Sequence, residues 1–426
     1  MSYLILAIFL GLAVLGMPLA FALGSAALAA LLFMGIDVNM LPQRMMHSVN
    51  SFPLMAIPFF MLAGELMLKA GIMERLVEFA NAFIGRVRGG LAHVTLLSGA
   101  GLATVSGTAV ADASALSATL VPALEKSYGR GFATAIVAAA ANLGPIIPPS
   151  AAMIVYAYMA GSTVSVGGLF LAGVVPGLLI AGGMMAICSI IAHRRNYPLT
   201  GEAISLRNIF FQLKRSLIVF LMPVVVLGGI IGGAFTATEG AAIAVVYALF
   251  IGFFITRKLR LSDLPALFVR AAITTAVVGA LIAFASAVTF LFTVDLLPQQ
   301  LAEALRALTD NRLVFNLIVA VMLFVVGMFM ESNAAYIMLV PLFHPLAISF
   351  GIDPLHFAFL FVLNLVIGML TPPVGVVLFV VCGITHVKMR ELMRHVWPFV
   401  ALMYGVLIAC MLFPPLVTAL PHWAGY

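Results

Sequence analysis

The fold is decided by Leu143-Gly144-Pro145-Ile146-Ile147-Pro148-Pro149, a stretch that recurs in the second half as Ile367-Gly368-Met369-Leu370-Thr371-Pro372-Pro373. Each stretch places a pair of prolines inside a long apolar run. Proline has no amide hydrogen and clashes with the carbonyl group one turn back, so a regular helix does not continue through either stretch. We therefore expect two broken helices, one in each half of the chain, in largely apolar surroundings.

The composition identifies those surroundings as a lipid bilayer. Of the 426 residues, 64% are hydrophobic and 8% are charged, whereas about 25% of the residues of a soluble protein are charged. Because one membrane span takes about 20 apolar residues, the length suggests about ten crossings. The runs 1–36 and 217–254 are apolar on every face, unlike the strands of a β-barrel. We expect an all-α polytopic membrane protein.

The composition also argues against several other classes. The net charge is +6, but the basic residues stand singly or in pairs beside apolar runs, so they indicate membrane orientation and no nucleic-acid partner. The three cysteines lie in apolar stretches without a CxxC pair, which disfavours a disulfide framework or a zinc site. The sequence contains no HExxH, GxxxxGK(S/T) or GxSxG motif, so we do not expect an enzyme.

Ten apolar segments follow one another along the chain, and two of them are too long for one span. Gly16-Met17-Pro18 should divide the first segment into two short helices, and the sixth should divide near Gly232. The segments are 3–34, 52–70, 91–122, 131–160, 167–192, 216–256, 271–294, 312–343, 355–385 and 396–420.

Two further segments, 91–122 and 312–343, are interrupted by a polar tip that contains glycine. The tips are Ser106-Gly107-Thr108 and Gly327 to Asn333. A polar interruption in the middle of an apolar segment is typical of a chain that turns inside the membrane, where the break faces protein or water. We interpret both segments as re-entrant helical hairpins that enter and leave the membrane on one side.

The distribution of basic residues predicts the orientation. If the loop that contains Arg194 and Arg195 is cytoplasmic, alternation of the spans places 18 of the 21 lysines and arginines on the cytoplasmic side. Only Arg44, Arg306 and Arg312 then lie outside. Under this topology the first hairpin opens from the cytoplasm, the second opens from outside, and both termini lie outside.

The same topology predicts two inverted repeats. Ala111-Asp112, followed by Val121-Pro122, matches Met330-Glu331, followed at the same distance by Val340-Pro341. The first repeat, 1–192, has scaffold helices 1–70, an interfacial arm helix 71–90, and a hairpin and broken helix 91–160. After a cytoplasmic linker, 193–215, the second repeat, 216–426, has scaffold helices 216–294, an arm helix 295–311, a hairpin and broken helix 312–385, and a last helix 396–420. Inverted repeats with broken helices are typical of alternating-access transporters.

The hairpin tips and the proline breaks are candidate Na+ sites. A helix break in hydrocarbon leaves backbone groups unpaired unless a cavity, an ion or protein faces them. The tips offer hydroxyl and carbonyl oxygens, which are hard ligands, and the prolines free carbonyls one turn earlier. Alternatively, the small residues serve only close helix packing. The Na+ candidates are Ser106, Gly107, Thr108, Asp112, Gly144, Gly327, Glu331, Gly368 and Thr371.

Two acidic residues in these segments, Asp112 and Glu331, are the strongest functional candidates. An ionised carboxylate inside a membrane is costly and normally has a cation or a donor as partner. The alternative is an acid in the first turn of a helix, where it complements the helix dipole. Glu65 and Glu239 also lie in or near apolar spans, and we interpret both as structural residues bonded to helix ends or interfaces.

We expect the substrate between the two tips and beside the proline breaks. The helices that leave the tips present N-terminal amides, which favour an anion. The substrate-binding candidates are Asn142, Pro148, Pro149, Ser150, Ser332, Asn333, Asn364, Pro372 and Pro373.

The tips and breaks together resemble a known family. Ser106 to Asp112, Asn142 to Ser150, Gly327 to Glu331 and Asn364 to Gly375 are similar to segments of the large membrane subunit of TRAP transporters, the tripartite ATP-independent periplasmic family. The resemblance covers essentially the whole chain. It implies that Asp112 and Glu331 are the ion-binding carboxylates, although family members commonly have Asp at the second position.

The resemblance also implies a function and partners. The chain would be the Na+-coupled, elevator-type permease of a bacterial inner membrane. It would work with a small four-helix membrane subunit and a periplasmic substrate-binding protein that delivers an organic acid, such as a sialic acid or a C4-dicarboxylate. No cofactor besides the coupling ion Na+ is expected.

Two other functional classes are alternatives. The first is a gated anion channel, or an ion-coupled anion carrier that works without a binding protein. The second is an intramembrane enzyme, for which the sequence offers no nucleophile and base at usable spacing. Saturating flux that depends on a Na+ gradient and on a soluble binding protein would distinguish the carrier from the channel.

Overall fold

The computed structural model is almost entirely helical and describes residues 2–84, 86–197, 199–200 and 205–426. The described residues form twenty α-helices, α1 to α20, and two short strands that pair antiparallel, β1 (Val87–Arg88) and β2 (Leu199–Thr200). Residues 198 and 201–204 of the predicted linker, and residue 85 of the predicted first arm, lie outside the described residues. The expected all-α class is confirmed.

Eight helical segments of the described residues are long and apolar enough to cross a membrane. The sequence suggested about ten crossings. The number is smaller because the breaks leave pieces of 10 to 17 residues, each shorter than the roughly 20 residues of one span. The eight segments are Phe52–Lys69, Val166–Arg194, Ile209–Ile231, Ala237–Ile255, Leu261–Val294, Arg312–Phe329, Ser332–Ser349 and Met389–Leu412.

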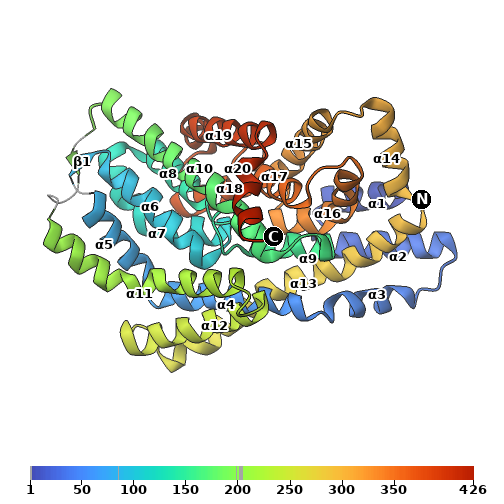
Figure 1. Cartoon of the computed structure of the whole chain (residues 1–426), viewed down its shortest axis with the longest axis horizontal. Helices are drawn as coiled ribbons and strands as arrows, with labels where there is room; N and C mark the ends of the chain where they lie inside the picture. The colour runs from blue at the N-terminus through green and yellow to red at the C-terminus, as the bar shows by residue number, and fades with distance from the viewer. Residues whose placement is uncertain (1, 85, 198, 201–204) are drawn as a thin grey trace.

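Seven helices, which we call the scaffold, come from the beginning and the middle of the chain, and most of them lie along one long side of the molecule (Figure 1). Within it, α13 packs against α2, α3 and α4, and α12 packs against α4 and α11. Their bounds are α1 Ser2–Val14, α2 Leu19–Met34, α3 Met40–Val49, α4 Ala56–Lys69, α11 Leu206–Ile231, α12 Ala237–Phe250 and α13 Leu264–Val294. Short 3-10 turns cover Phe52–Met55 and Leu261–Asp263, and a π-helical turn covers Ile251–Ile255.

A second group of helices, which we call the hairpin body, contains both hairpins and both broken helices. The hairpins are α6 (Gly90–Ser106) with α7 (Ala109–Tyr128), and α15 (Arg312–Phe329) with α16 (Ser332–Ser349). The broken helices are α8 (Arg130–Ala141) with α9 (Ala151–Ala160), and α17 (Pro354–Gly368) with α18 (Val376–Thr385). The body also contains a 3-10 turn, Gly161–Thr163, and the helices α10 (Val166–Arg194), α19 (Met389–Leu412) and α20 (Pro415–Trp423).

Contacts between the two halves of the chain hold the hairpin body together. α7 packs against α18, α8 against α19, and α9 against α16. The α9–α16 contact is centred on Tyr156, whose hydroxyl lies 3.0 Å from Nδ1 of the buried His344. The other ring nitrogen of His344 lies 2.8 Å from the Thr163 hydroxyl, and the ring of Phe361 packs edge-on against Tyr156. Buried polar groups are thus paired across the interface between the halves.

Most of the expected helix breaks are present, and a few helices differ from the expectation. The break at Gly16 separates α1 from α2, and a break after Ile231 separates α11 from α12. The single last helix expected over 396–420 is wrong, because Pro414-Pro415 divides it into α19 and α20. Helix α3 lies where we expected none. Helix α11 begins at residue 206, so the end of the predicted linker is helical.

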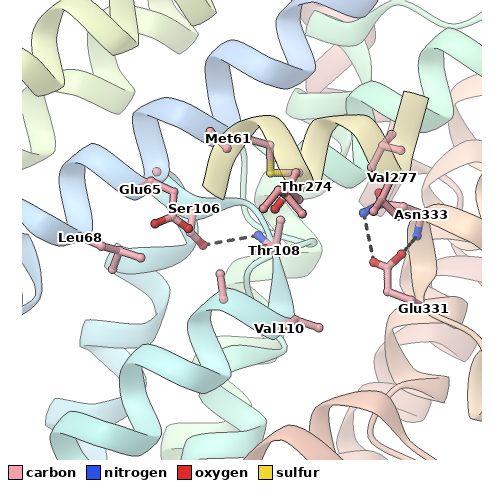
Figure 2. A pocket seen from close by; sticks show the side chains of 15 residues that line it. Met61, Glu65, Leu68, Ser106, Thr108, Val110, Thr274, Val277, Glu331 and Asn333 are labelled. Atoms are coloured by element: carbon pink, nitrogen blue, oxygen red, sulfur yellow. Dashed lines mark hydrogen bonds between the residues drawn. The ribbon is translucent and has the colours of Figure 1, made fainter. Parts of the chain in front are cut away.

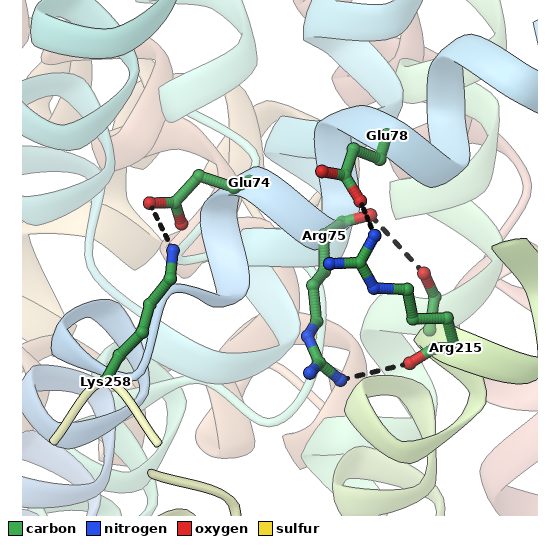
Figure 3. Close-up of polar contacts among 6 residues, drawn as sticks. Glu74, Arg75, Glu78, Arg215 and Lys258 are labelled. Carbon is green, nitrogen blue, oxygen red and sulfur yellow. Dashed lines mark hydrogen bonds and ion pairs between the residues drawn. The ribbon is translucent and has the colours of Figure 1, made fainter. Parts of the chain in front are cut away.

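The arm helix α5 (Ile72–Ile84) is joined to the scaffold by charged side chains (Figure 3). Arg215 on α11 donates to Glu78 over 2.7 Å, and Arg75 donates to the carbonyl of Arg215 over 3.2 Å. Lys258 donates to Glu74 over 2.9 Å. The corresponding segment before the second hairpin forms α14 (Leu297–Leu308), where Arg306 donates to the carbonyl of Ser349 over 3.0 Å.

Candidate functional site

The first hairpin turns at Ser106-Gly107-Thr108, as the sequence predicted. α6 ends at Ser106, Gly107 has a φ of +62°, and Thr108 in extended conformation begins α7. A positive φ is easily adopted by glycine, which explains why glycine occupies this turn. The Ser106 hydroxyl donates to Oδ1 of Asp112, which is fully buried in the first turns of α7.

The first proline break packs directly behind this tip. A side-chain carbon added to Gly107 would lie 2.7 Å from the Ala151 amide nitrogen. A side-chain carbon added to Gly144 would lie 2.5 Å from Oδ2 of Asp112 and 3.0 Å from the carbonyl carbon of Thr108. The predicted Na+ candidates of the first half therefore lie close together in space. Only glycine at position 144 leaves room for the carboxylate.

The second hairpin turns at Met330 and Glu331, and here the geometry differs from the first. Glu331 is the N-cap of α16, where its Oε2 accepts from the amides of Asn333, over 2.9 Å, and Ala334, over 3.4 Å. Its other oxygen accepts from the Ser332 hydroxyl and from the Asn333 side-chain amide. Asp112 and Glu331 are equally spaced from their following prolines, but only Glu331 caps its helix.

The second break packs against the second hairpin through the glycines Gly327 and Gly368. A side-chain carbon added to Gly368 would lie 2.6 Å from the Gly327 Cα. The amide of Gly375, at the end of the break, donates to the carbonyl of Met328 over 2.9 Å. Thr371 donates its hydroxyl to the carbonyl of Ile367 over 2.9 Å. Gly327 itself lies within α15, one turn before the tip.

Two asparagines, Asn142 and Asn364, cross-link the broken helices to their neighbours. Asn142 donates through Nδ2 to the carbonyl of Val366 over 2.8 Å, and Asn364 donates to the carbonyl of Ala320 over 2.7 Å. The side-chain oxygens of both asparagines are buried without a hydrogen-bond partner among the described residues. Each asparagine thus holds a break in position through its nitrogen and keeps an oxygen free.

The remaining predicted residues lie in the breaks themselves. Ser150 caps α9, accepting from the Met153 amide over 3.4 Å and donating to the carbonyl of Pro145 over 2.9 Å. The Pro148–Pro149 and Pro372–Pro373 peptide bonds are both cis.

A cavity of about 370 Å³ lies between the two hairpin tips and the scaffold helices α4 and α13 (Figure 2). Glu65 and Ser106 lie toward one end of it, and Glu331 with Asn333 lies toward the other. We call it the central cavity. Its wall is formed by α4 (Met61, Gly64, Glu65, Leu68), the first hairpin (Ser106, Thr108, Val110, Ala111), α13 (Ala271, Ile273, Thr274, Val277, Val278) and the second hairpin (Glu331, Asn333).

The predicted site residues divide into two groups relative to this cavity. Ser106, Thr108, Glu331 and Asn333 are part of its wall. The others lie behind the tips or in the breaks and are not among its described lining residues: Gly107, Asp112, Asn142, Gly144, Pro148, Pro149, Ser150, Gly327, Ser332, Asn364, Gly368, Thr371, Pro372 and Pro373. Of the substrate-binding candidates, Asn333 alone therefore faces the described part of this cavity.

The scaffold contributes wall residues that sequence reasoning assigned differently or missed. Glu65, which the sequence predicts to be a structural acid, faces the central cavity and makes no hydrogen bond or ion pair with the described residues. The sequence does contain a reason to expect this role, because an acidic residue within an apolar span is by default a functional candidate. Nothing in the sequence around Thr274 predicts that it lines a cavity. Glu239, in contrast, is structural as expected, because it forms a capping box with Thr236.

The unpaired polar atoms around the tips fit a hard cation. Oδ2 of Asp112 and the side-chain oxygens of Asn142, Asn333 and Asn364 are buried without a hydrogen-bond partner in the described part of the chain. All four atoms are acceptors, and buried acceptors normally have a partner. Oxygen ligands from carboxylates and amides suit hard cations, and the described residues contain no cluster of three His, Cys, Asp or Glu that would suit zinc.

The chain is similar to known proteins over most of its length. The family described as "Tripartite ATP-independent periplasmic transporter, DctM component" matches residues 6–416. The chain is 37% identical over 420 residues to the sialic acid TRAP transporter large permease protein of Vibrio cholerae, covering 98% of both chains. It is 37% identical over 402 residues to the C4-dicarboxylate TRAP transporter large permease protein of Pseudomonas aeruginosa, covering 94% of this chain and 93% of that protein. The fold is similar to the YdaH transporter of Alcanivorax borkumensis, with a TM-score of 0.67, 16% identity and 88% of each chain covered.

Proposed function

The chain belongs to the DctM component family of tripartite ATP-independent periplasmic transporters, and from this premise we propose that it imports an organic acid together with Na+. It is a multi-pass protein of the bacterial inner membrane. The proposed partners are a small membrane subunit and a periplasmic binding protein that delivers the substrate. Relatives named for sialic acid and for a C4-dicarboxylate support a carboxylate substrate.

The charge of the central cavity is the observation that carries Na+ coupling. Its described wall contains the carboxylates of Glu65 and Glu331 and no lysine, arginine or histidine. An anion that enters such a cavity meets like charge in surroundings of low dielectric constant, where the repulsion is strong. Cations bound beside the cavity remove this repulsion. Substrate and Na+ would therefore bind together, which is the thermodynamic basis of symport.

We assign one Na+ site to each hairpin and its neighbouring break. The first site comprises Ser106, Gly107, Thr108, Asp112 and Gly144. The second comprises Gly327, Glu331, Gly368 and Thr371. The unpaired oxygens of Asp112, Asn142 and Asn364 support these positions. One Na+ that moves inward across −100 mV releases about 2.3 kcal/mol, so two ions can compensate the charge of a carboxylate and still concentrate it. No other cofactor is proposed.

The substrate is assigned to the space between the tips. Asn333 lines the central cavity directly. The other substrate candidates pack behind the tips and would reach a substrate when the tips move aside. They are Ser332 at the start of α16, and Asn142, Pro148, Pro149, Ser150, Asn364, Pro372 and Pro373 in or beside the breaks.

The proposed mechanism is an elevator in which the hairpin body moves against the scaffold. The two groups of helices, and the matching order of arm, hairpin and broken helix in each half, support inverted repeats. The cavity lies between the two groups, where a relative movement would change its exposure. The arm helix α5 is bonded to the scaffold through Glu78 and Arg215, and packs on α6 of the hairpin body. Helix α5 would therefore connect the scaffold with the hairpin body and would bend as the hairpin body moves.

Uptake by proteoliposomes tests the proposal. The Asp112→Ala variant should lose Na+-driven uptake of the acid delivered by its binding protein, while its elution profile and thermal unfolding remain those of a folded protein. Glu239→Gln, which changes a carboxylate in a capping box away from the cavity, is the matched control and should retain uptake. Unchanged Na+ dependence in the Asp112 variant would exclude the first site. Non-saturating flux without a Na+ gradient would indicate a channel.

A further inference from the structure

A second cavity, which we call the outer cavity, lies beside the scaffold helices α3 and α13. Its volume is about 790 Å³, larger than that of the central cavity. α3 contributes Arg44 and His47, and α13 contributes the hydroxyl residues Ser286, Thr289 and Thr293. The end of α9 and Pro341 of α16 complete the wall, so the outer cavity also lies between the scaffold and the hairpin body.

The charge of the outer cavity is opposite to that of the central cavity. No aspartate or glutamate belongs to its described wall, whereas Arg44 does. The guanidinium carbon of Arg44 lies 4.0 Å from the centre of the Phe290 ring, and the side chain makes no ion pair with the described residues. A guanidinium that packs on an aromatic face keeps its planar fork of N–H groups available for a carboxylate. The hydroxyls of Ser286 and Thr289 add further donors, whereas the hydroxyl of Thr293 donates to the carbonyl of Thr289 over 2.8 Å.

Helix α13 connects the outer cavity with the central one. Thr274 and Val278 line the central cavity, and Ile282 lines the outer cavity. A smaller pocket of about 180 Å³ lies between them and includes both Val278 and Ile282. Because Thr274, Val278 and Ile282 are each four residues apart, one face of α13 borders all three spaces. The three spaces therefore follow one another along the boundary between the scaffold and the hairpin body.

We propose that the outer cavity binds the carboxylate group of the substrate before it enters the central cavity, with Arg44 as the main donor. This inference rests on the proposed function, which supplies an organic acid as the substrate. Arg44 is also one of three basic residues that the charge distribution places on the outer side of the membrane. The anion is held by fixed positive charge in the outer cavity and proceeds to the acidic central cavity only when cations are bound there.

Charge-selective labelling tests the electrostatic part without any transport. A Thr289→Cys substitution places a thiol in the outer cavity, in a chain whose partly exposed Cys382 is replaced by alanine. The protein is held in nanodiscs of neutral phosphatidylcholine. The rate of modification by negatively charged sulfonatoethyl methanethiosulfonate is divided by the rate for its positively charged trimethylammonium analogue. Adding Arg44→Gln should lower this ratio about fivefold or more.

Arg306→Gln is the matched control for this measurement. Its guanidinium also lies near an aromatic ring, 5.7 Å from the centre of Phe350, and the charge distribution also places it outside, but it does not line the outer cavity. The ratio should be unchanged in this variant. An unchanged ratio in Arg44→Gln, or an equal decrease in both variants, would overturn the assignment of Arg44.

Protection by succinate distinguishes a free carboxylate from a lipid headgroup. Succinate should slow the negatively charged reagent in neutral nanodiscs, and Arg44→Gln should remove this protection. If succinate does not protect, and the reagent is slowed only when the nanodiscs contain phosphatidylglycerol, the cavity binds a lipid and the substrate assignment is wrong. None of these readouts depends on a Na+ gradient. Failure of the proposed symport in the Asp112 experiment is therefore distinguishable from failure of the outer site.

Discussion

Gly144→Ala is the most direct probe of the proposed first Na+ site. The new methyl group would lie 2.5 Å from Oδ2 of Asp112, and 3.0 and 3.1 Å from the carbonyl carbon and oxygen of Thr108. Two of these three atoms belong to the backbone of the hairpin tip, so they cannot move away by a change of rotamer. The Asp112 carboxylate must therefore shift, or the tip must separate from the break.

The expected magnitude follows from the cost of overpacking a closely packed site, which is about 1–3 kcal/mol. Since 1.4 kcal/mol corresponds to a factor of ten in affinity, this cost corresponds to about 5- to 150-fold weaker Na+ binding when it falls on the ion-bound state. The assay is the Na+ concentration that gives half-maximal uptake in proteoliposomes at fixed substrate. We expect it to rise within this range, while uptake at saturating Na+ is partly recovered.

Gly405→Ala is the control for the added methyl group. It lies in α19 with no heavy atom within 4 Å of the new carbon, and alanine favours a helix by roughly 1 kcal/mol relative to glycine. Its Na+ dependence should equal that of the wild type. A Gly144→Ala variant with an unchanged half-saturating Na+ concentration would refute the placement of an ion between Asp112 and the first break.

Three further predictions concern stability. Gly368→Ala should reduce the free energy of unfolding by about 1–3 kcal/mol, and so lower the unfolding temperature, because the new carbon would lie 2.6 Å from the backbone of α15. A variant as stable as the wild type would contradict this contact. Asn142→Leu should be destabilised by about 1–3 kcal/mol, because it leaves the buried carbonyl of Val366 without its donor, and equal unfolding temperatures would disprove that bond. Partial burial alone would raise the pKa of Glu74, but the hydrogen bond from Lys258 holds it below its ordinary value of 4.5. The stability that this pair contributes is therefore present above pH 4.5 and is lost as the pH falls through the lowered pKa of Glu74 in the folded state. The wild type should unfold at a slightly higher temperature than Lys258→Met at neutral pH, and this difference should disappear at acidic pH. A difference that does not change with pH would show that the pair is absent.

The helix breaks were predictable because they depend on local chemistry. A proline pair cannot continue a helix whatever surrounds it, so the ends of α8 and α17 follow from the residues alone. The turn at Gly107 follows in the same way from a glycine between two hydroxyl residues within an apolar segment. The helix break after Ile231 likewise follows from the local sequence near Gly232. These features needed no knowledge of distant parts of the chain.

The wall of the central cavity could not be predicted in the same way, because it depends on contacts between distant helices. Glu65 on α4 faces the hairpin tips only because α4 packs against α6. The difference between Asp112 and Glu331 has another cause. The side chain of Glu331 reaches back to the first amides of α16, so that helix begins beside it, whereas Thr108 takes the corresponding position before α7. Equal spacing to a proline does not reveal which residue begins a helix.

The hydrogen bond from Asn142 to the carbonyl of Val366 has a consequence for the fidelity of coupling in the proposed cycle. It joins the first break to α17, and the bond from Asn364 to Ala320 joins α17 to the second hairpin. Displacing one break relative to the other would leave a buried carbonyl unpaired, at a cost of about 1–3 kcal/mol. States in which the two ion sites face opposite sides of the membrane should therefore be about 5- to 150-fold rarer. A half-loaded carrier would then seldom release one ion inward while the other site faced outward, and the rare opening of these two hydrogen bonds would limit how fast the Na+ gradient dissipates without carrying substrate.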